Sequence, residues 1–337
     1  MNTATTPIRT TMMAIDPDEA GGPEVLKPVE RPVPKPGPGE VLIEVAAAGV
    51  NRPDVMQRLG RYPPPPGAPT IPGLEVAGRV VAVGAGELPQ WIGKPVCALV
   101  SGGGYAEYCT APSGQCLSVP GTFTMVEAAA LPETFFTVWA NLFHHSYLGR
   151  EDTLLVHGGT SGIGIAALLL GQIFELNVIV TAGSDEKCRR ALEQGAAWAI
   201  NYRTHDFVEE VRRLMEGRGV DVVLDMIGGD YVARNLACVA DEGRHVSIAA
   251  QRGATAEIPL WEVMRRRLTL TGSTLRARSA EYKATLASEI RREVWPHLEV
   301  GRIRPVIDSV YPLARAAEAH ARMESSEHVG KIVLQVK

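Results

Sequence analysis

Closely spaced glycines are the residues whose pattern points most directly to chemistry. The segment VHGGTSGIGIAA (residues 156–167) places them between small and apolar residues. Glycine lets a backbone approach a pyrophosphate, and the unpaired N–H groups at the start of a following helix bind phosphate oxygens. The alternative is a tight structural turn. We expect a dinucleotide here, contacted by Gly159, Ser161, Gly162, Ile163 and Gly164.

The elements around this loop predict how it is positioned. TLLVHGG is typical of a buried strand, and GIAALLLGQIFE predicts the helix that follows the loop. Strand and helix patterns then alternate at least four times between residues 131 and 275, including helices through YVARNLACVADEG and DFVEEVRRLMEGRG. This alternation indicates an α/β domain with a parallel sheet covered on both faces.

The segments on either side of this domain have a different composition. Residues 12–130 contain short strand patterns and turn signals rich in Gly and Pro, which indicate a β-rich domain. Residues 276–337 begin with one helix pattern, AEYKATLASEIRREVWPHLEVG, and end with strand patterns resembling those of the first segment. We expect them to return to the first domain. The chain is thus predicted to contain two domains, 12–130 with 276–337, and 131–275.

The spacing of the glycines fits two families of reductase. Gly158, Gly162 and Gly164 match the spelling found in short-chain reductases, which carry this loop at the start of the chain and use a Tyr with a Lys four residues later. Here about 150 residues precede the loop, and none of the eight tyrosines has Lys at that position. The short-chain family is therefore rejected.

The end of the second predicted strand distinguishes NADP from NAD. An acidic residue there would bind the ribose 2′-hydroxyl of NAD, but the strand ends VTAGSDEK, with Gly183 and Ser184 where the acid is expected. Ser184 and Lys187 could hold a 2′-phosphate, and Tyr202 could cover the adenosine phosphate. Ser184 could also simply cap a helix, and Asp185 and Glu186 bring negative charge to this place. We favour NADPH.

Composition excludes several other classes. The 337 residues carry a net charge of −4, which does not indicate a nucleic-acid binder. No apolar run approaches the roughly 18 residues of a membrane span, and the start MNTATTPIRT lacks the apolar core of a secretory signal. It reads as an extension, with the fold starting near Met12. Five scattered cysteines without a CxxC pair predict a reducing, cytoplasmic location and no structural zinc.

Several longer motifs resemble one family. AGVNRPDVMQRLGRYPPPPG, IPGLEVAGRVVAVG and AAALPETFFTVW, followed by the glycine loop and TAGS, are similar to the medium-chain dehydrogenase/reductase superfamily. Within it, the chain looks like the NADPH-dependent quinone oxidoreductases, especially the p53-inducible quinone oxidoreductase-like group. The resemblance covers residues 12–337. It implies a GroES-like catalytic domain plus a doubly wound Rossmann domain, an active site in the cleft, and a homodimer formed through the Rossmann domain.

The resemblance also bears on metal and site residues. Zinc members carry Cys at the position of Asn51 and His in place of Leu74, so we expect no zinc, no alcohol oxidation, and a structural role for Glu75. Tyr62 stands where related enoyl-thioester reductases have a proposed acid; Thr137 matches a position touching the nicotinamide, and Asn51 could donate to ribose or substrate. Each has a structural alternative. Tyr62 could pack on proline, Thr137 could bond back to its own helix, and Asn51 could form a local Asx turn. Further cofactor contacts implied by family position are Ile227, Gly228, Ala249, Leu275 and His328.

Three hypotheses for function follow. The first is zinc-independent reduction of a small-molecule quinone by NADPH, since without a metal the acceptor must already be electrophilic. The second is an NADPH-dependent enoyl or enone reductase with Tyr62 as general acid. The third is a non-catalytic NADPH-binding protein, which would not need Asn51, Tyr62 and Thr137 together.

Overall fold

A computed structural model describes residues 8–337, and these form two compact units. Unit 1 contains the described residues up to Glu133, together with Arg276–Gly301 and Ile307–Lys337. Unit 2 contains Thr134–Leu275 and Arg302–Val306. Part of the extension expected before Met12 lies outside the described residues, and the first strand begins at Thr11.

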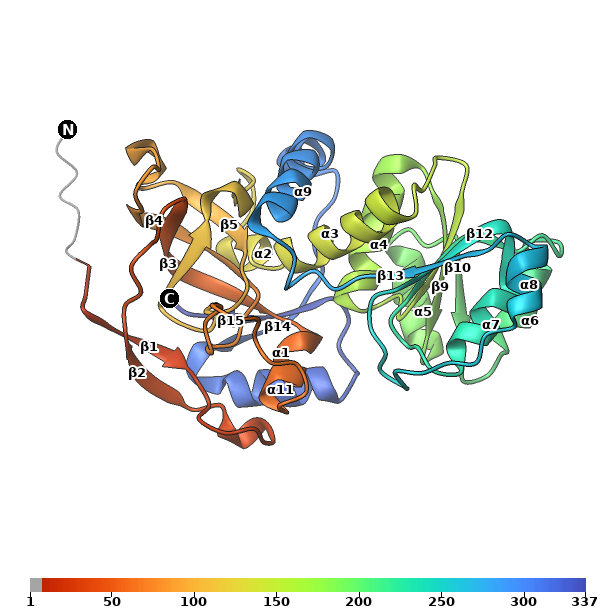
Figure 1. Cartoon of the computed structure of the whole chain (residues 1–337), viewed down its shortest axis with the longest axis horizontal. Helices are drawn as coiled ribbons and strands as arrows, with labels where there is room; N and C mark the ends of the chain where they lie inside the picture. Colours follow the sequence, from red (N-terminus) through yellow and green to blue (C-terminus); the bar gives the residue numbers. More distant parts are fainter. Residues whose placement is uncertain (1–7) are drawn as a thin grey trace. The chain divides into compact units, whose positions relative to one another are not determined.

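Unit 1 is built on a seven-stranded sheet with the order β14-β15-β3-β4-β5-β7, in which β6 also pairs with β3 (Figure 1). Its strands are β3 (Glu40–Val50), β4 (Glu75–Val83), β5 (Pro95–Leu99), β6 (Tyr108–Pro112), β7 (Cys116–Ser118), β14 (Ile307–Pro312) and β15 (Lys331–Gln335). A separate antiparallel pair is formed by β1 (Thr11–Ile15) and β2 (Pro28–Pro32). The helices of this unit are α1 (Arg52–Arg58), α2 (Met125–Ala128), α9 (Ala280–Glu293), α10 (Trp295–Glu299) and α11 (Ala316–Glu324).

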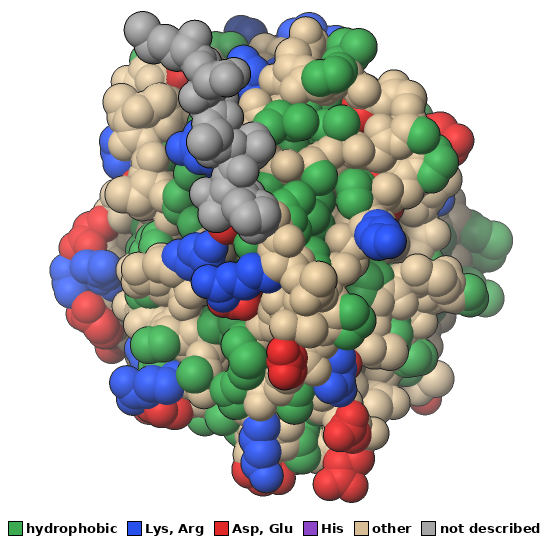
Figure 2. All heavy atoms as spheres, turned by 90° about the vertical axis from the view of Figure 1, so that its left-hand side faces the viewer, with side chains coloured by type: hydrophobic (Ala, Val, Ile, Leu, Met, Phe, Trp, Pro, Cys, Tyr) green, Lys and Arg blue, Asp and Glu red, His purple; other side chains and the backbone are tan. Residues whose placement is uncertain are grey.

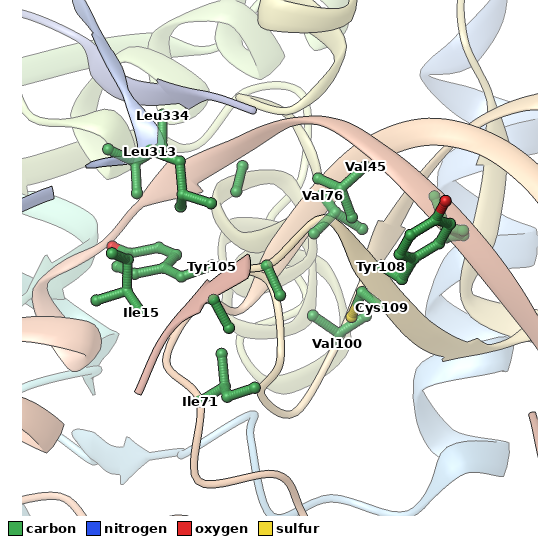
Figure 3. Packing of buried hydrophobic residues seen from close by; sticks show 14 of the residues in the cluster. Ile15, Val45, Ile71, Val76, Val100, Tyr105, Tyr108, Cys109, Leu313 and Leu334 are labelled. Carbon is green, nitrogen blue, oxygen red and sulfur yellow. The ribbon is translucent and has the colours of Figure 1, made fainter. Parts of the chain in front are cut away.

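The last strand of the chain lies inside this sheet. β15 pairs antiparallel with β3, with Ile332 opposite Val50, and parallel with β14. The C-terminal strands therefore return to the first segment, as their composition indicated. A buried apolar cluster holds the unit together, and Figure 3 shows Tyr105 beside Ile15 and Leu313 within it.

Unit 2 contains a six-stranded, entirely parallel sheet with the order β10-β9-β8-β11-β12-β13. The strands are β8 (Thr153–His157), β9 (Asn177–Ala182), β10 (Trp198–Asn201), β11 (Val220–Asp225), β12 (Val239–Ser247) and β13 (Thr269–Gly272). Its helices are α4 (Gly162–Phe174), α5 (Asp185–Glu193), α6 (Phe207–Leu214), α7 (Tyr231–Cys238) and α8 (Leu260–Arg265), while α3 (Pro132–Trp139) crosses the boundary between the units. The strand order reverses between β8 and β11, and a parallel sheet with this order is the doubly wound fold that was expected.

Two helix predictions were wrong in part. The helix expected through Gly243 ends at Cys238, because Val239 pairs with Val220 of the neighbouring strand and starts β12. The single helix expected from residue 280 is two helices, since Pro296 has no N–H and stands near the start of α10. Both errors concern where a helix ends, which a local pattern marks less clearly than the presence of the helix.

Figure 2 shows basic and acidic side chains interspersed on one face of the described chain. No helix within residues 8–337 is long and apolar enough to span a membrane. All five cysteines are buried free thiols.

Candidate active site

The glycine loop connects the central strand β8 to α4. Gly158 has φ +72°, and Ser161 caps the helix by accepting a hydrogen bond from Gly164 N at 3.1 Å. A Cβ on Gly164 would lie 2.4 Å from the Gly158 carbonyl oxygen, so only glycine lets the helix approach the loop this closely. The first turn of α4 therefore stands at the carboxyl end of the sheet, where a parallel doubly wound fold binds its ligand.

The turn after β9 carries the residues expected at a 2′-phosphate. The Ser184 hydroxyl accepts from Lys187 N at 3.2 Å, so Ser184 does cap α5. A Cβ placed on Gly183 would lie 2.8 Å from the Tyr202 hydroxyl and 3.6 Å from Arg203 Nε. Gly183, Tyr202 and the guanidinium of Arg203 thus share one place at the end of neighbouring strands. Arg203 was missed in the sequence, although it directly follows Tyr202.

The two acids that weigh against NADP are both engaged by neighbours. Asp185 Oδ1 accepts a hydrogen bond from Asn201 Nδ2 at 2.7 Å. Glu186 is bound by both arms of the Arg189 guanidinium, with Nε at 3.1 Å and Nη2 at 2.5 Å, and this contact holds the pKa of Glu186 below its usual value. Their negative charges are therefore directed at protein groups on α5 and β10.

The other expected cofactor contacts in unit 2 follow the remaining strands. Ile227 and Gly228 come after β11, and Asp225 Oδ1 accepts from the N–H groups of both, at 2.7 and 3.2 Å. Ala249 follows β12 and Leu275 follows β13. All these positions are at the carboxyl ends of parallel strands, the edge that also carries the glycine loop.

A network of buried hydrogen bonds connects the strands next to this edge of the sheet. His157 Nδ1 lies 2.9 Å from Thr181 Oγ1, and His157 Nε2 lies 2.7 Å from Asn235 Oδ1. His245 Nε2 lies 3.2 Å from Asp225 Oδ2, and the contact with His245 helps to hold the pKa of this carboxyl low against the opposing effect of burial. The network links the strands to the loop at Ile227 and positions it. Nothing in the local sequence pattern indicated it.

In unit 1, Asn51 lies at a junction of three neighbouring strands. Its amide Nδ2 donates to Glu75 Oε1 at 2.8 Å, and its Oδ1 accepts from Lys331 Nζ at 2.5 Å. Lys331 Nζ also lies 2.6 Å from Glu75 Oε1. Glu75 is completely buried and Lys331 is 4% exposed. Asn51 is therefore held between a buried carboxylate and a buried ammonium, and Glu75 has the structural role expected.

The remaining residues expected at the site are Tyr62 and Thr137, predicted for the reaction, and His328, predicted as a cofactor contact. Tyr62 is half-buried, with the Arg276 guanidinium carbon 5.6 Å from its ring centre, and burial raises its pKa. Thr137 is half-buried on α3, and its carbonyl accepts from Asn141 Nδ2 at 2.8 Å. His328 is buried in unit 1 just before β15. Tyr62, Asn51 and His328 thus belong to unit 1, and Thr137 to unit 2.

Comparison with known proteins shows the family. Residues 37–121 match the alcohol dehydrogenase GroES-like domain, and residues 194–334 match the zinc-binding dehydrogenase domain. The chain is 34% identical over 329 residues to the quinone oxidoreductase of Lama guanicoe, covering 97% of this chain and 98% of that one. The chain belongs to the medium-chain dehydrogenase/reductase superfamily. Its relatives include quinone oxidoreductases, and it is an oxidoreductase.

Solved structures of this superfamily show the same fold. A mycobacterial protein complexed with NADPH is 31% identical, with a TM-score of 0.86 over 96% of this chain and 100% of that one. The Escherichia coli quinone oxidoreductase complexed with NADPH is 29% identical, with a TM-score of 0.85 over 97% of this chain and 100% of that one. The JamJ enoyl reductase is 25% identical, with a TM-score of 0.85 over 97% of this chain and 99% of that one.

The zinc implied by one domain's name does not fit the donor groups of this medium-chain dehydrogenase/reductase. The positions of the metal ligands hold Asn51 and Leu74, and the neighbouring carboxylate of Glu75 is paired with the ammonium of Lys331. A cationic side chain thus stands where a cation would need donors. Within residues 8–337, no cluster of three or more His, Cys, Asp or Glu side chains is arranged to hold a metal.

Proposed function

We propose that this chain reduces quinones with NADPH, without zinc. The observation that carries the proposal is the glycine loop before α4, together with Lys187 on α5 and Arg203 just after β10. The relatives of the chain include quinone oxidoreductases. Residues that would hold the cofactor are those at the carboxyl ends of the unit 2 strands. When bound, NADPH supplies the reducing equivalents.

The side chains of this chain supply binding and orientation. The N–H groups at the start of α4 bind pyrophosphate oxygens, and Gly164 permits the close approach. Tyr62 is half-buried, so its ring can line the acceptor site and its hydroxyl can donate a proton. Burial raises the pKa of this hydroxyl and keeps it protonated. The acceptor must be electrophilic because the donor set around Asn51 offers no metal to polarise a carbonyl.

The alternative is reduction of an enoyl or enone group, which the similarity to an enoyl reductase structure favours. We would follow NADPH oxidation by the absorbance of the nicotinamide, using metal-stripped protein with an ortho-quinone or with a short enoyl-thioester. Quinone turnover alone, retained in Tyr62→Phe, is the expected result. Enoyl-thioester turnover abolished in Tyr62→Phe would instead assign an enoyl reductase, and NADPH binding without reduction of either would indicate a binding protein.

We also propose a homodimer formed at the free edge of the unit 2 sheet. β13 is the last strand of that sheet, and α8 beside it exposes three apolar side chains: Leu260, Trp261 and Met264, at 67%, 70% and 62%. The edge of β13 and the apolar face of α8 next to it are together suited to pairing with a second copy of the chain.

Trp261→Glu is expected to convert this dimer to a monomer in light scattering, because it places a charge in the apolar contact. Tyr147→Glu, at another exposed aromatic of the same unit (79% exposed), should leave the mass unchanged. A wild-type protein that is already monomeric would refute the dimer.

A further inference from the structure

A buried guanidinium in unit 1 has two terminal nitrogens with no hydrogen-bond partner among residues 8–337. Arg276 is 6% exposed, and its Nε donates to the Ser101 carbonyl oxygen at 2.9 Å. Its Nη1 and Nη2 are buried and bond to no group within residues 8–337. An unsatisfied buried donor is costly, and a charged one more so. The two terminal nitrogens of Arg276 could therefore donate hydrogen bonds to a bound acceptor group.

A second buried cation stands beside the first. Lys283 on α9 is 2% exposed, and its Nζ donates to the Arg276 carbonyl oxygen at 2.7 Å and to Ser101 Oγ at 3.0 Å. In the part of the chain that the structure describes, neither cation is within ion-pair distance of a carboxylate. Burial lowers the pKa of both groups, the direction expected of cations without a counter-ion.

The acid Glu133, whose charge would act on both cations, carries little negative charge at neutral pH. Glu133, at the start of α3, has its pKa raised to about 8 by burial and by the negative charges of Glu75 and Asp54. Lys331 and Lys283 act in the opposite sense and are outweighed. The Glu133 carboxyl thus keeps its proton at pH 7. The negative charge that acts most on Arg276 is that of Asp54, whose pKa burial raises to about 6, and Asp54 is not within ion-pair distance of the guanidinium.

The backbone of Gly102 and the ring of Tyr62 lie close to the guanidinium. A Cβ on Gly102 would lie 3.5 Å from Arg276 Nη2 and 2.7 Å from the Pro69 carbonyl oxygen. Tyr62, from the proline-rich loop, has its ring 5.6 Å from the guanidinium carbon. A planar group held by the two Nη atoms would therefore have an aromatic ring near it.

We propose that Arg276 binds a carboxylate of the acceptor, so that the substrates are quinones or enones bearing an acid group. The inference rests on the proposed reductase function and names its substrate class. The paired Nη donors of a guanidinium match the two oxygens of a carboxylate, and Lys283 adds charge and fixes the Arg276 backbone. The Tyr62 ring is suited to the conjugated body of such a molecule.

The test compares a benzoquinone bearing a carboxymethyl group with its methyl ester. Binding of each to the NADP⁺-loaded protein is measured by titration calorimetry, and kcat and KM are measured with NADPH. The wild-type protein should bind the acid at least tenfold more tightly than the ester. In Arg276→Gln that preference should fall to about one, through KM rather than kcat, with Arg276→Lys intermediate. Arg278→Gln, an exposed arginine two residues away, is the control and should keep the preference.

The outcomes separate this inference from the function on which it rests. Equal binding of acid and ester by the wild-type protein overturns the carboxylate site even where both quinones are reduced. Loss of NADPH affinity in Arg276→Gln, with the preference for the acid kept, assigns the guanidinium to a cofactor phosphate and also overturns it. Tight binding of the acid without turnover supports the site while refuting quinone reduction.

Discussion

Replacing Lys331 by methionine is expected to lower the free energy of unfolding of unit 1 by about 3–5 kcal/mol. The substitution keeps most of the side-chain volume but removes the ammonium that contacts Glu75 and Asn51. Glu75, which is completely buried, would then carry its charge with only the hydrogen bonds from Asn51 Nδ2 and Glu133 N. Urea denaturation, followed by a probe in unit 1, measures the loss.

Two further variants make this expectation specific. Lys337→Met removes the exposed pair between Lys337 and Glu44, and should cost less than about 1 kcal/mol. The double variant Glu75→Gln with Lys331→Met should recover most of the lost stability, because it removes the buried charge. The Gln oxygen can still accept from Glu133 N, and its NH2 can donate to Asn51 once the Asn51 amide turns its Oδ1, no longer bound by Lys331, toward it. Equal losses for the two lysine variants would show that the buried pair contributes little.

The double variant Lys187→Ala with Arg203→Ala is expected to raise KM for NADPH about ten- to hundredfold and to leave KM for NADH nearly unchanged. The 2′-phosphate is the group that distinguishes the two cofactors, and the guanidinium of Arg203 lies beside Gly183 at the turn where this phosphate would sit. Steady-state kinetics with both cofactors measures the change.

A control substitution tests whether the effect depends on where the positive charge is removed or only on the net charge of the protein. Arg213→Ala, an exposed arginine on α6 paired with Glu210, should alter neither constant. An equal rise in KM for both cofactors would place the 2′-phosphate elsewhere. The single variant Lys187→Ala should show the same selectivity with a smaller effect.

The parts of the molecule that follow from local pattern were predictable from the sequence. The alternation of strands and helices gave the parallel sheet of unit 2, and the glycine spacing gave the loop between β8 and α4, because period and turn chemistry act over a few residues. The return of the C-terminal strands to unit 1 followed from their composition.

The contacts that connect distant segments were not predictable from a single sequence. Lys331 and Asn51 are 280 residues apart, and Arg276 and Ser101 are 175 apart. In the segment GKIVL, nothing distinguishes Lys331 from any lysine at the start of a strand. In STLRARS, the pattern does not separate the buried Arg276 from the exposed Arg278. The burial of Lys331 follows from the sheet order, which brings β15 beside β3, and that of Arg276 from the packing of its segment against Ser101.

The position of β15 has a consequence for synthesis on the ribosome. All of unit 2 leaves the exit tunnel before residues 331–335 do, yet β15 lies between β14 and β3 in unit 1. Until then the edge of β3 at Ala47–Val50 lacks its partner, and Glu75 lacks its cation. An unpaired apolar edge is a site of aggregation. Nascent chains of this protein thus carry an incomplete first unit through most of translation, which is the interval in which a chaperone would be needed.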